Sequence, residues 1–281
     1  MSELLVATDL SPRAERAQRR ATLLARRNGL ALRLVHVIDA DQPAALIDAH
    51  HQHAQSILQR LADTIETDDG VACTATIRHA RGIDEGIRNA VTTDTRALVV
   101  GRHRPRLLRD LFLGGTSERI IAHAPCPVLV AQAAPIEAYH RLVVGTDLSA
   151  PAQSGLEALA ACRLFDDAAM DLVHVIGSTD QAALTGNRMS DGGRDRTWAD
   201  EKAHATAAVQ QLARDSALGA VGEHVEVDTR PVAVALVALA EREGGDLLVT
   251  CPRERTASEK LLRYSVTRRL LNDSPTDLLI V

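Results

Sequence analysis

The chain has 281 residues, of which 46% are hydrophobic and 25% are charged, and its formal net charge is −5. This length suits two domains of ordinary size, and the composition is that of a folded globular protein rather than a disordered one. The negative charge argues against general affinity for nucleic acid, and an aromatic content of 2% is too low for a base-stacking surface. No apolar stretch approaches the roughly 20 residues needed to cross a bilayer.

Cysteine usage points to a reducing compartment. Four cysteines are scattered along the chain without a C-x-x-C spacing: Cys73, Cys126, Cys162 and Cys251. Scattered thiols are typical of cytosolic proteins, and the first residues lead directly into a strand rather than into a signal-like apolar run. We therefore expect a cytoplasmic protein.

In the first half, apolar runs alternate with helix-period stretches. The patterns predict strands at 3–8, 31–38, 71–78, 96–101 and 127–132, and helices at 12–28, 43–67, 83–94 and 116–124. Such alternation predicts an α/β fold with a doubly wound parallel sheet and right-handed crossovers. Ala97-Leu98-Val99-Val100 is apolar throughout, as expected of a strand buried on both faces.

The second half repeats this pattern. Strands are predicted at 141–146, 170–176, 224–229, 245–251 and 277–281. The short connection at 133–138 places a domain boundary near residue 137, which gives domains 1–136 and 137–281. The second domain is longer, and the surplus is predicted to be a loop over 177–195, which is rich in Gly, Ser, Asp and Asn.

The two halves are also similar in detail. Each first strand ends in Thr-Asp-Leu-Ser, at 8–11 and at 146–149, and each second strand ends in His-Val-Ile, at 36–38 and at 174–176. Residues 101–130 and 251–280 align without a gap. Self-similarity of this kind indicates a duplicated structural unit, so the question is which copy keeps a site.

A ligand site is expected beyond the carboxyl ends of the parallel strands, where the strand order reverses. In the first half those ends carry Thr8-Asp9, Val37-Ile38 and Gly101, followed by a polar loop to Gly114-Gly115-Thr116-Ser117. Glycines at a helix start let backbone N–H groups approach an anion, although the same residues could simply cap the helix. Asp9 could likewise cap a loop or contact a ligand.

These features resemble the universal stress protein family, specifically its tandem two-domain members. The resemblance rests on the Thr-Asp-Leu-Ser strand ends, the glycine loop, and His123-Ala124-Pro125-Cys126-Pro127-Val128-Leu129-Val130. It implies two Rossmann-like domains of the adenine-nucleotide alpha hydrolase type, packed as a pseudo-dimer through their last strands. The nucleotide-binding branch of that family has a phosphate loop of the form G-x2-G-x9-G-[ST].

The first copy keeps this loop in part. Gly101 and Gly114 hold the first and third glycine positions, whereas Arg104 replaces the second glycine and Gly115 stands before Thr116. Arg104 could obstruct the backbone approach or donate to the phosphates. The resemblance implies one set of nucleotide-binding residues: Ala7, Thr8, Asp9, Val37, Gly101, His103, Arg104, Gly114, Gly115 and Thr116.

The second copy retains no glycine in the loop. Its aligned residues are Cys251, Glu254, Tyr264 and Ser265, of which the glutamate would repel a phosphate and the tyrosine would block it. Asp147 persists, but this site is expected to be absent or altered.

Three functions remain open. The first is a stress-response protein that binds ATP or another adenine nucleotide in its first domain, with Mg²⁺ only if ATP is bound, and acts through conformation and unidentified protein partners. The second is an enzyme of the same architecture, with slow ATP hydrolysis or nucleotidyl transfer. The third is a ligand-free interaction module. Fold alone does not choose among them, and a further homodimer is also left open.

Other signals are weak. The basic cluster from Arg102 to Arg109 could attract anions or be a solvated surface. His50, His51 and His53 are interpreted as surface histidines, because no nearby Cys or carboxylate completes a tetrahedral metal set. Motifs for P-loops, dinucleotide folds, zinc proteases and hydrolase elbows do not occur, so neither catalytic nor metal-binding residues are assigned.

Overall fold

The computed structural model describes residues 1–102, 116–177, 191–251 and 260–281, and it describes no side chains at 13, 116–118, 191–197 and 260–265. The chain divides into two compact units, Met1–Ala138 and Tyr139–Val281. Each unit is built from alternating strands and helices around a parallel sheet, which confirms the predicted fold class.

The first unit has five parallel strands in the order β3-β2-β1-β4-β5. Its described elements are β1 (Glu3–Ala7), α1 (Pro12–Asn28), β2 (Ala31–Asp39), α2 (Ala44–Thr64), the π-helical turn η1 (Ile65–Asp69), β3 (Cys73–Ala80), α3 (Ile83–Arg88), β4 (Thr95–Gly101), α4 (Thr116–His123) and β5 (Val128–Ala131). The strand order reverses between β1 and β4, since β2 lies on one side of β1 and β4 on the other.

The second unit repeats this order as β8-β7-β6-β9-β10. Its described elements are β6 (Arg141–Gly145), α5 (Ala150–Cys162), β7 (Ala169–Ile176), α7 (Asp191–Asp215), β8 (Gly222–Val227), α8 (Val232–Glu243), β9 (Leu247–Thr250), α9 (Lys260–Asp273) and β10 (Asp277–Ile280). The switch point of this sheet is therefore between β6 and β9.

Helix α1 shows how local sequence sets these elements. Pro12 occupies the first turn, where a missing N–H costs little, and Gly29 ends the helix in the left-handed conformation with φ of 63°. Its buried face consists of Ala14, Ala17, Ala21, Leu24 and Ala25, all at most 6% exposed. Small residues at helical spacing let α1 lie close to β1 and β4.

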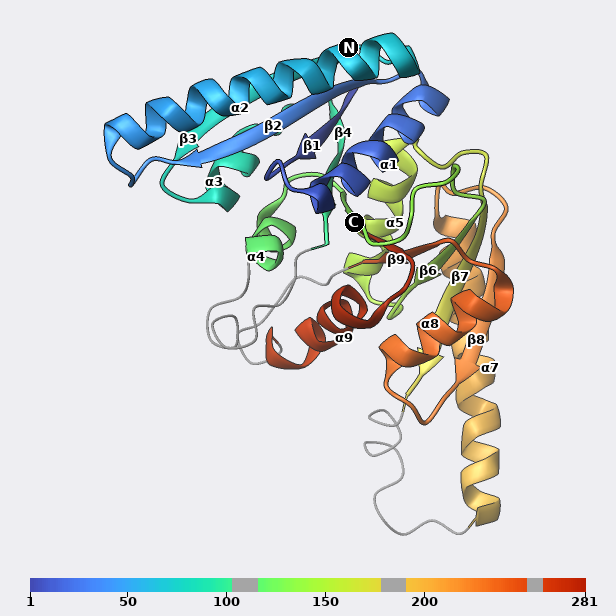
Figure 1. Ribbon diagram of the computed structural model, residues 1–281. Helices are drawn as coiled ribbons and strands as arrows, with labels where there is room; N and C mark the ends of the chain where they lie inside the picture. Colours follow the sequence, from blue (N-terminus) through green and yellow to red (C-terminus); the bar gives the residue numbers. More distant parts are fainter. Residues whose placement is uncertain (103–115, 178–190, 252–259) are drawn as a thin grey trace. The chain divides into compact units, whose positions relative to one another are not determined.

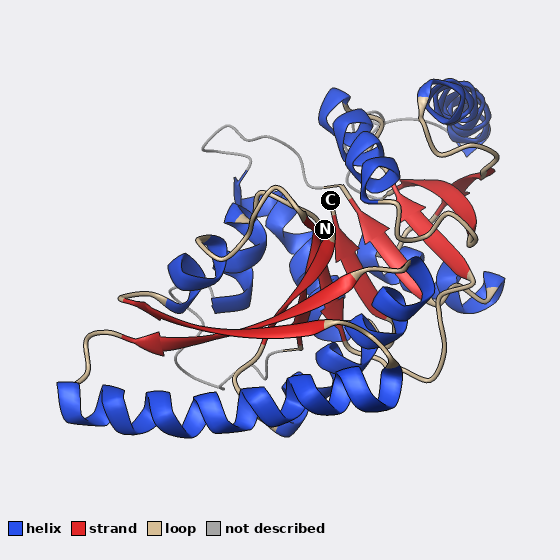
Figure 2. Cartoon of the chain, turned by 90° about the horizontal axis from the view of Figure 1, so that it is seen from above, coloured by secondary structure: helices blue, strands red, loops and turns tan. Residues whose placement is uncertain are grey.

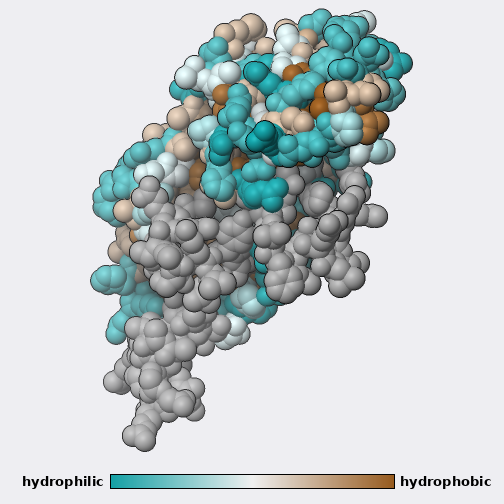
Figure 3. Space-filling view, turned by 90° about the vertical axis from the view of Figure 1, so that its left-hand side faces the viewer, coloured by the Kyte–Doolittle hydropathy of each residue, from teal (hydrophilic) through white to brown (hydrophobic). Residues whose placement is uncertain are grey.

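Helices cover both faces of the first sheet. Helix α2 lies along β2 and β3 (Figures 1 and 2), and α1 contacts the η1 turn that follows α2, where Arg19 pairs with Asp69 at 2.5 Å. Helices α3 and α4 contact each other, and Arg119 pairs with Asp84 at 3.2 Å. Right-handed crossovers place α1 and α2 on one face and α3 and α4 on the other. On the side shown in Figure 3, the coloured surface is mainly hydrophilic.

Three predicted boundaries differ from the structure. Helix α2 ends at Thr64 and continues as η1, and α3 ends at Arg88 rather than near residue 94. The backbone N–H of Thr92 donates to Thr95 Oγ1, a local bond that competes with helix. Helix α7 begins at Asp191, so part of the predicted loop 177–195 is helical, while 178–190 lies outside the described residues. Pairing of the two units through their last strands stays a prediction.

An ion pair joins the first two strands of each sheet, with the charges reversed. In the first unit Arg33 of β2 donates to Glu3 of β1 through Nε and Nη2, the shorter bond being 2.6 Å. In the second unit Arg141 of β6 donates to Asp171 of β7 at 2.7 Å. Glu3 and Arg33 are each less than 15% exposed in their side chains, so a lone charge there would be poorly solvated.

The reversed polarity of the second unit's ion pair can be introduced into the first unit by two substitutions. We expect Arg33→Asp to destabilise the first unit by about 3 kcal/mol, because two carboxylates would then share one half-buried place. Adding Glu3→Arg should recover most of that loss, because it reproduces the polarity of the second unit. Urea unfolding of the two single variants and the double variant measures the coupling. Additive losses would show that the pair does not matter for stability.

Candidate functional site

The first strand of the sheet ends in a tight turn that leads into α1. Leu10 has φ of 60°, which a side chain with a Cβ adopts at a cost. Two hydrogen bonds hold the turn: Leu10 N–H donates to Thr8 Oγ1 and Ser11 N–H donates to Asp9 Oδ1, both at 3.0 Å. Asp9 therefore caps the turn, whatever further role it has.

The second unit builds the same turn. Leu148 also has φ of 60°, and its N–H donates to Thr146 Oγ1 at 3.1 Å. Ser149 N–H donates to Asp147 Oδ1 at 3.0 Å. The repeated Thr-Asp-Leu-Ser sequence is thus explained by backbone geometry in both copies, and Asp147 is no evidence of a second ligand site.

A histidine supports each turn from the neighbouring strand. His36 Nδ1 donates to the Thr8 carbonyl at 2.8 Å, and His174 Nδ1 donates to the Thr146 carbonyl at 3.0 Å. His36 is 6% exposed, and its Nε2 is buried without a hydrogen-bond partner among the described residues. Sequence analysis did not assign this role, although the repeated His-Val-Ile was its signal.

The switch point brings several predicted site residues together. Ala7 pairs with Val100, so Gly101 and Thr8 follow at adjacent strand ends, with exposed Asp9 after Thr8. Val37 lies further along β2, on the face opposite His36, and Gly86 of α3 packs against it. His103, Arg104, Gly114 and Gly115 lie outside the described residues, and Thr116 begins α4 but its side chain is not described.

The corresponding edge of the second sheet is filled by side chains. Gly145 stands at the position of Ala7, and a Cβ placed there would lie 3.1 Å from Leu236 Cδ1 of α8. Cys251 stands at the position of Gly101, and a Cβ on Gly155 of α5 would lie 2.7 Å from its Sγ. Leu236 is only 3% exposed, and burial raises the pKa of the Cys251 thiol to about 12, so this thiol is a packing group. Glu254 lies outside the described residues, and the side chains of Tyr264 and Ser265 are not described.

Comparisons with known proteins fit this duplicated geometry. The profile of the Universal stress protein family matches twice, over residues 1–132 and 138–281. The chain belongs to the universal stress protein family. No curated protein sequence matches it.

Solved structures of similar length share the fold of this tandem member. A universal stress protein from Archaeoglobus fulgidus DSM 4304 is 15% identical with a TM-score of 0.70, covering 99% of this chain and 95% of that one. A putative universal stress protein from Pseudomonas aeruginosa UCBPP-PA14 is 16% identical with a TM-score of 0.60, covering 100% and 93%. A functionally unknown protein from P. aeruginosa PAO1 is 13% identical with a TM-score of 0.61, covering 100% and 92%.

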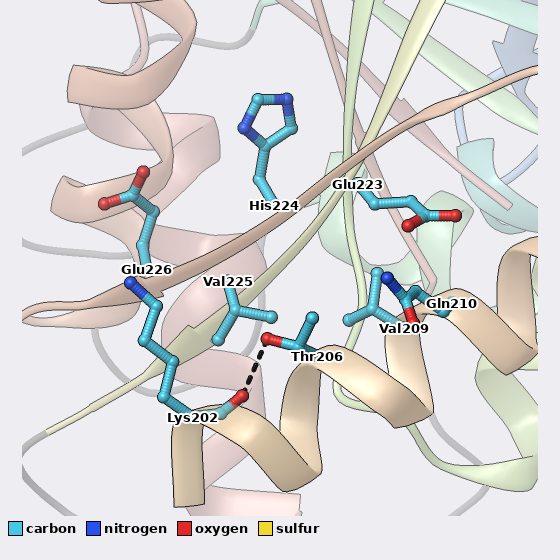
Figure 4. A pocket seen from close by; sticks show the side chains of 8 residues that line it. All are labelled: Lys202, Thr206, Val209, Gln210, Glu223, His224, Val225 and Glu226. Atoms are coloured by element: carbon cyan, nitrogen blue, oxygen red, sulfur yellow. Dashed lines mark hydrogen bonds between the residues drawn. The ribbon is translucent and has the colours of Figure 1, made fainter. Parts of the chain in front are cut away.

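The second domain of this universal stress protein also contains a pocket of about 320 Å³ between α7 and β8 (Figure 4). It is lined by Lys202, Thr206, Val209, Gln210, Glu223, His224, Val225 and Glu226. Lys202 extends from α7 toward Glu226 of β8, and the lining carries both signs of charge. Because β7 separates β8 from β6, this pocket is not at the switch point, and no motif in the sequence marked it.

The described residues contain neither a cluster of metal-ligating side chains nor a helix that could span a membrane. No three His, Cys, Asp or Glu side chains among them gather as a metal set. Within the same residues no helix is both long and apolar enough to cross a membrane.

The packing of Cys251 against Gly155 predicts that the effect of one substitution on stability changes sign with the background. In the parent, Gly155→Ala should destabilise by about 1–3 kcal/mol, because the new methyl meets Cys251. In a Cys251→Gly background the same substitution should stabilise by up to about 1 kcal/mol, because alanine favours helix over glycine. Thermal unfolding of the four proteins measures this, and a loss of equal size in both backgrounds would contradict the packing argument.

His36 gives a prediction about pH. Burial lowers the pKa of His36 below its ordinary value, against the opposing effects of the Thr8 carbonyl and Asp9, and His50 lowers it further. A depressed histidine pKa means that its contribution to stability is complete above about pH 6.5 and falls as the pH drops below that value, by at most about 1.4 kcal/mol per pH unit.

The matched variants are His36→Asn, whose amide can still donate to Thr8, and His53→Asn, which removes an exposed histidine. Chemical unfolding between pH 7.5 and 5 should show a shallower slope for His36→Asn only. Parallel slopes for all three proteins would show that His36 does not titrate between the folded and unfolded states.

Proposed function

We propose that this universal stress protein binds an adenine nucleotide, ATP by preference, in its first domain and acts in stress response through the resulting conformation. One observation carries the proposal: the β1–β4 switch point ends in Ala7 and Gly101, whereas the β6–β9 switch point is filled by Leu236 and Cys251. Small residues at strand ends leave room for a ligand, and this is the edge where open α/β sheets bind them.

The proposed site joins these strand ends to the glycine loop. Val37 would contact the base, and the N-terminus of α4 would face the phosphates with its backbone N–H groups and dipole. The proposed residues are Ala7, Thr8, Asp9, Val37, Gly101, His103, Arg104, Gly114, Gly115 and Thr116. One carboxylate oxygen of Asp9 already accepts a hydrogen bond from the Ser11 N–H, so a contact with a ligand would be made in addition to that bond. Mg²⁺ would enter with ATP only.

We infer that the protein works as a binding module. The pKa values of Cys73 and Cys126 are raised to about 12 and 11, chiefly by burial, so these thiols are not activated nucleophiles. An ATP-hydrolysing enzyme of the same architecture and a ligand-free interaction module are the outcomes that the experiments must separate. A cytoplasmic location is part of the proposal, in keeping with the scattered cysteines.

Gly114→Tyr copies the residue of the second domain into the first. We expect calorimetric binding of ATP to be lost, because the ring would occupy the phosphate position. Tyr264→Gly is the matched control in the other domain and should neither create a second site nor weaken the first, since Glu254 still repels an anion there. Binding retained by Gly114→Tyr, or abolished by Tyr264→Gly, would move the site to the second domain.

Arg104→Gly decides between binding and obstruction. If Arg104 closes over the phosphates, its charge-assisted bond contributes about 1.5–3 kcal/mol, and the variant should bind ATP roughly ten- to a hundredfold more weakly. Tighter binding would mean that the parent site is obstructed and would favour the ligand-free module. Phosphate release during a long incubation with ATP and Mg²⁺ would favour the enzyme.

A further inference from the structure

Two histidines from separate elements face each other on the first domain. His51 lies on α2 and His79 on β3, and His51 Nδ1 is 2.9 Å from His79 Nε2. The ring centroids are 5.2 Å apart with an interplanar angle of 41°. His79 is exposed and His51 is half-buried, so solvent reaches the pair. The proposed nucleotide site makes no use of either residue.

The two nitrogens are hydrogen-bonded, and their separation of 2.9 Å is also one that two ligands of a single metal ion can span. Imidazole nitrogens bind divalent metals at about 2.0–2.1 Å, so two such ligands at a right angle lie about 2.9 Å apart, against about 3.3 Å in a tetrahedron. Right-angled nitrogen ligands are typical of Ni²⁺ and Cu²⁺. Because both rings can turn, the choice of metal rests on the ligand type: imidazole sites bind Ni²⁺ and Cu²⁺ more tightly than the earlier divalent ions of the first row.

The fold fixes the backbone positions of both histidines before any ion binds. Helix α2 packs on β2 and β3, with Ala54 and Leu58 at most 1% exposed, and Ile38 pairs with His79 across the β2–β3 ladder. In the absence of metal, one of the facing nitrogens donates its N–H to the other. Metal binding requires the donor ring to carry its proton on its other nitrogen instead, and both rings to turn their lone pairs toward the ion. No third His, Cys, Asp or Glu among the described residues joins them, so water would complete the coordination.

We propose that His51 and His79 form a solvent-accessible two-histidine site for Ni²⁺ or Cu²⁺ that clamps α2 to β3. The sequence analysis interprets His51 as a surface histidine because no nearby Cys or carboxylate completes a metal set. Its partner His79 is 28 residues away, and no local spacing links the two. The site is independent of the nucleotide proposal, since it lies on a different helix and strand from the glycine loop.

The test uses Ni²⁺ as the probe, with full-length protein that carries no histidine tag. Calorimetry should detect one Ni²⁺ per chain, and His51→Ala and His79→Ala should each weaken it by about a hundredfold or more, because one imidazole alone lacks the advantage of two linked ligands. His53→Ala, an exposed histidine on the same helix, should leave the affinity unchanged. Ni²⁺ should also raise the melting temperature of the parent and not that of the two weakened variants.

Nuclear magnetic resonance locates the ion independently of affinity. Paramagnetic Ni²⁺ should broaden the ring signals of His51 and His79 before those of His53 and His140. Circular dichroism of both alanine variants checks that they remain folded. Absence of binding up to millimolar Ni²⁺, or equal binding by the parent and both alanine variants, would overturn the proposal and leave the pair as a hydrogen bond only.

Discussion

The turn after each first strand is the constraint on which the arrangement of each domain depends. A chain leaving β1 must reverse into α1 within four residues, and it does so by placing Leu10 in the left-handed region. Such a conformation costs about 1–2 kcal/mol, which the hydrogen bonds of Thr8, Asp9 and His36 offset. The turn fixes where α1 begins, and therefore which residues surround the switch point. Both domains use it, so its chemistry serves folding first.

The two domains differ by exchanges that keep each core filled. Where one has Glu3 and Arg33, the other has Arg141 and Asp171, and where one has Ala7 and Gly101, the other has Gly145 and Cys251. A lone change within an ion pair would leave a poorly solvated charge, and a side chain larger than glycine at position 145 would meet Leu236. At these places a residue in one domain is matched to its neighbour in the same domain, and the two domains use different matched residues. One difference is local: Gly101 ends β4 of the first sheet, whereas Cys251 stands at the corresponding position of the second and packs against Gly155.

Sequence patterns predict the strands and the duplication well, because buried parallel strands are continuous apolar runs and a repeat is visible without any structure. They fail where an element depends on distant partners. They also fail at the end of helix α3, which stops at Arg88, whereas the helical pattern continues to about residue 94. His36 was visible only as part of a repeated tripeptide, and His51 gained its partner only when α2 folded onto β3. The contacts of Leu236 with Gly145 and of Cys251 with Gly155 depend on how the helices pack on the sheet, which the sequence pattern does not give.

The Thr-Asp-Leu-Ser motif is a good guide to the fold and a poor guide to ligand binding, because its hydrogen bonds serve the turn in both domains. The motif is also present in the second domain, where Leu236 of α8 packs against Gly145. There its hydrogen bonds offset the cost of placing Leu148 in the left-handed region. A residue type retained for backbone geometry carries no information about a ligand. The side chains of Ala7 and Gly101 take no part in the hydrogen bonds of the turn, so the turn does not account for their small size. Ala7 and Gly101 are therefore stronger grounds for a site in the first domain than Asp9 is.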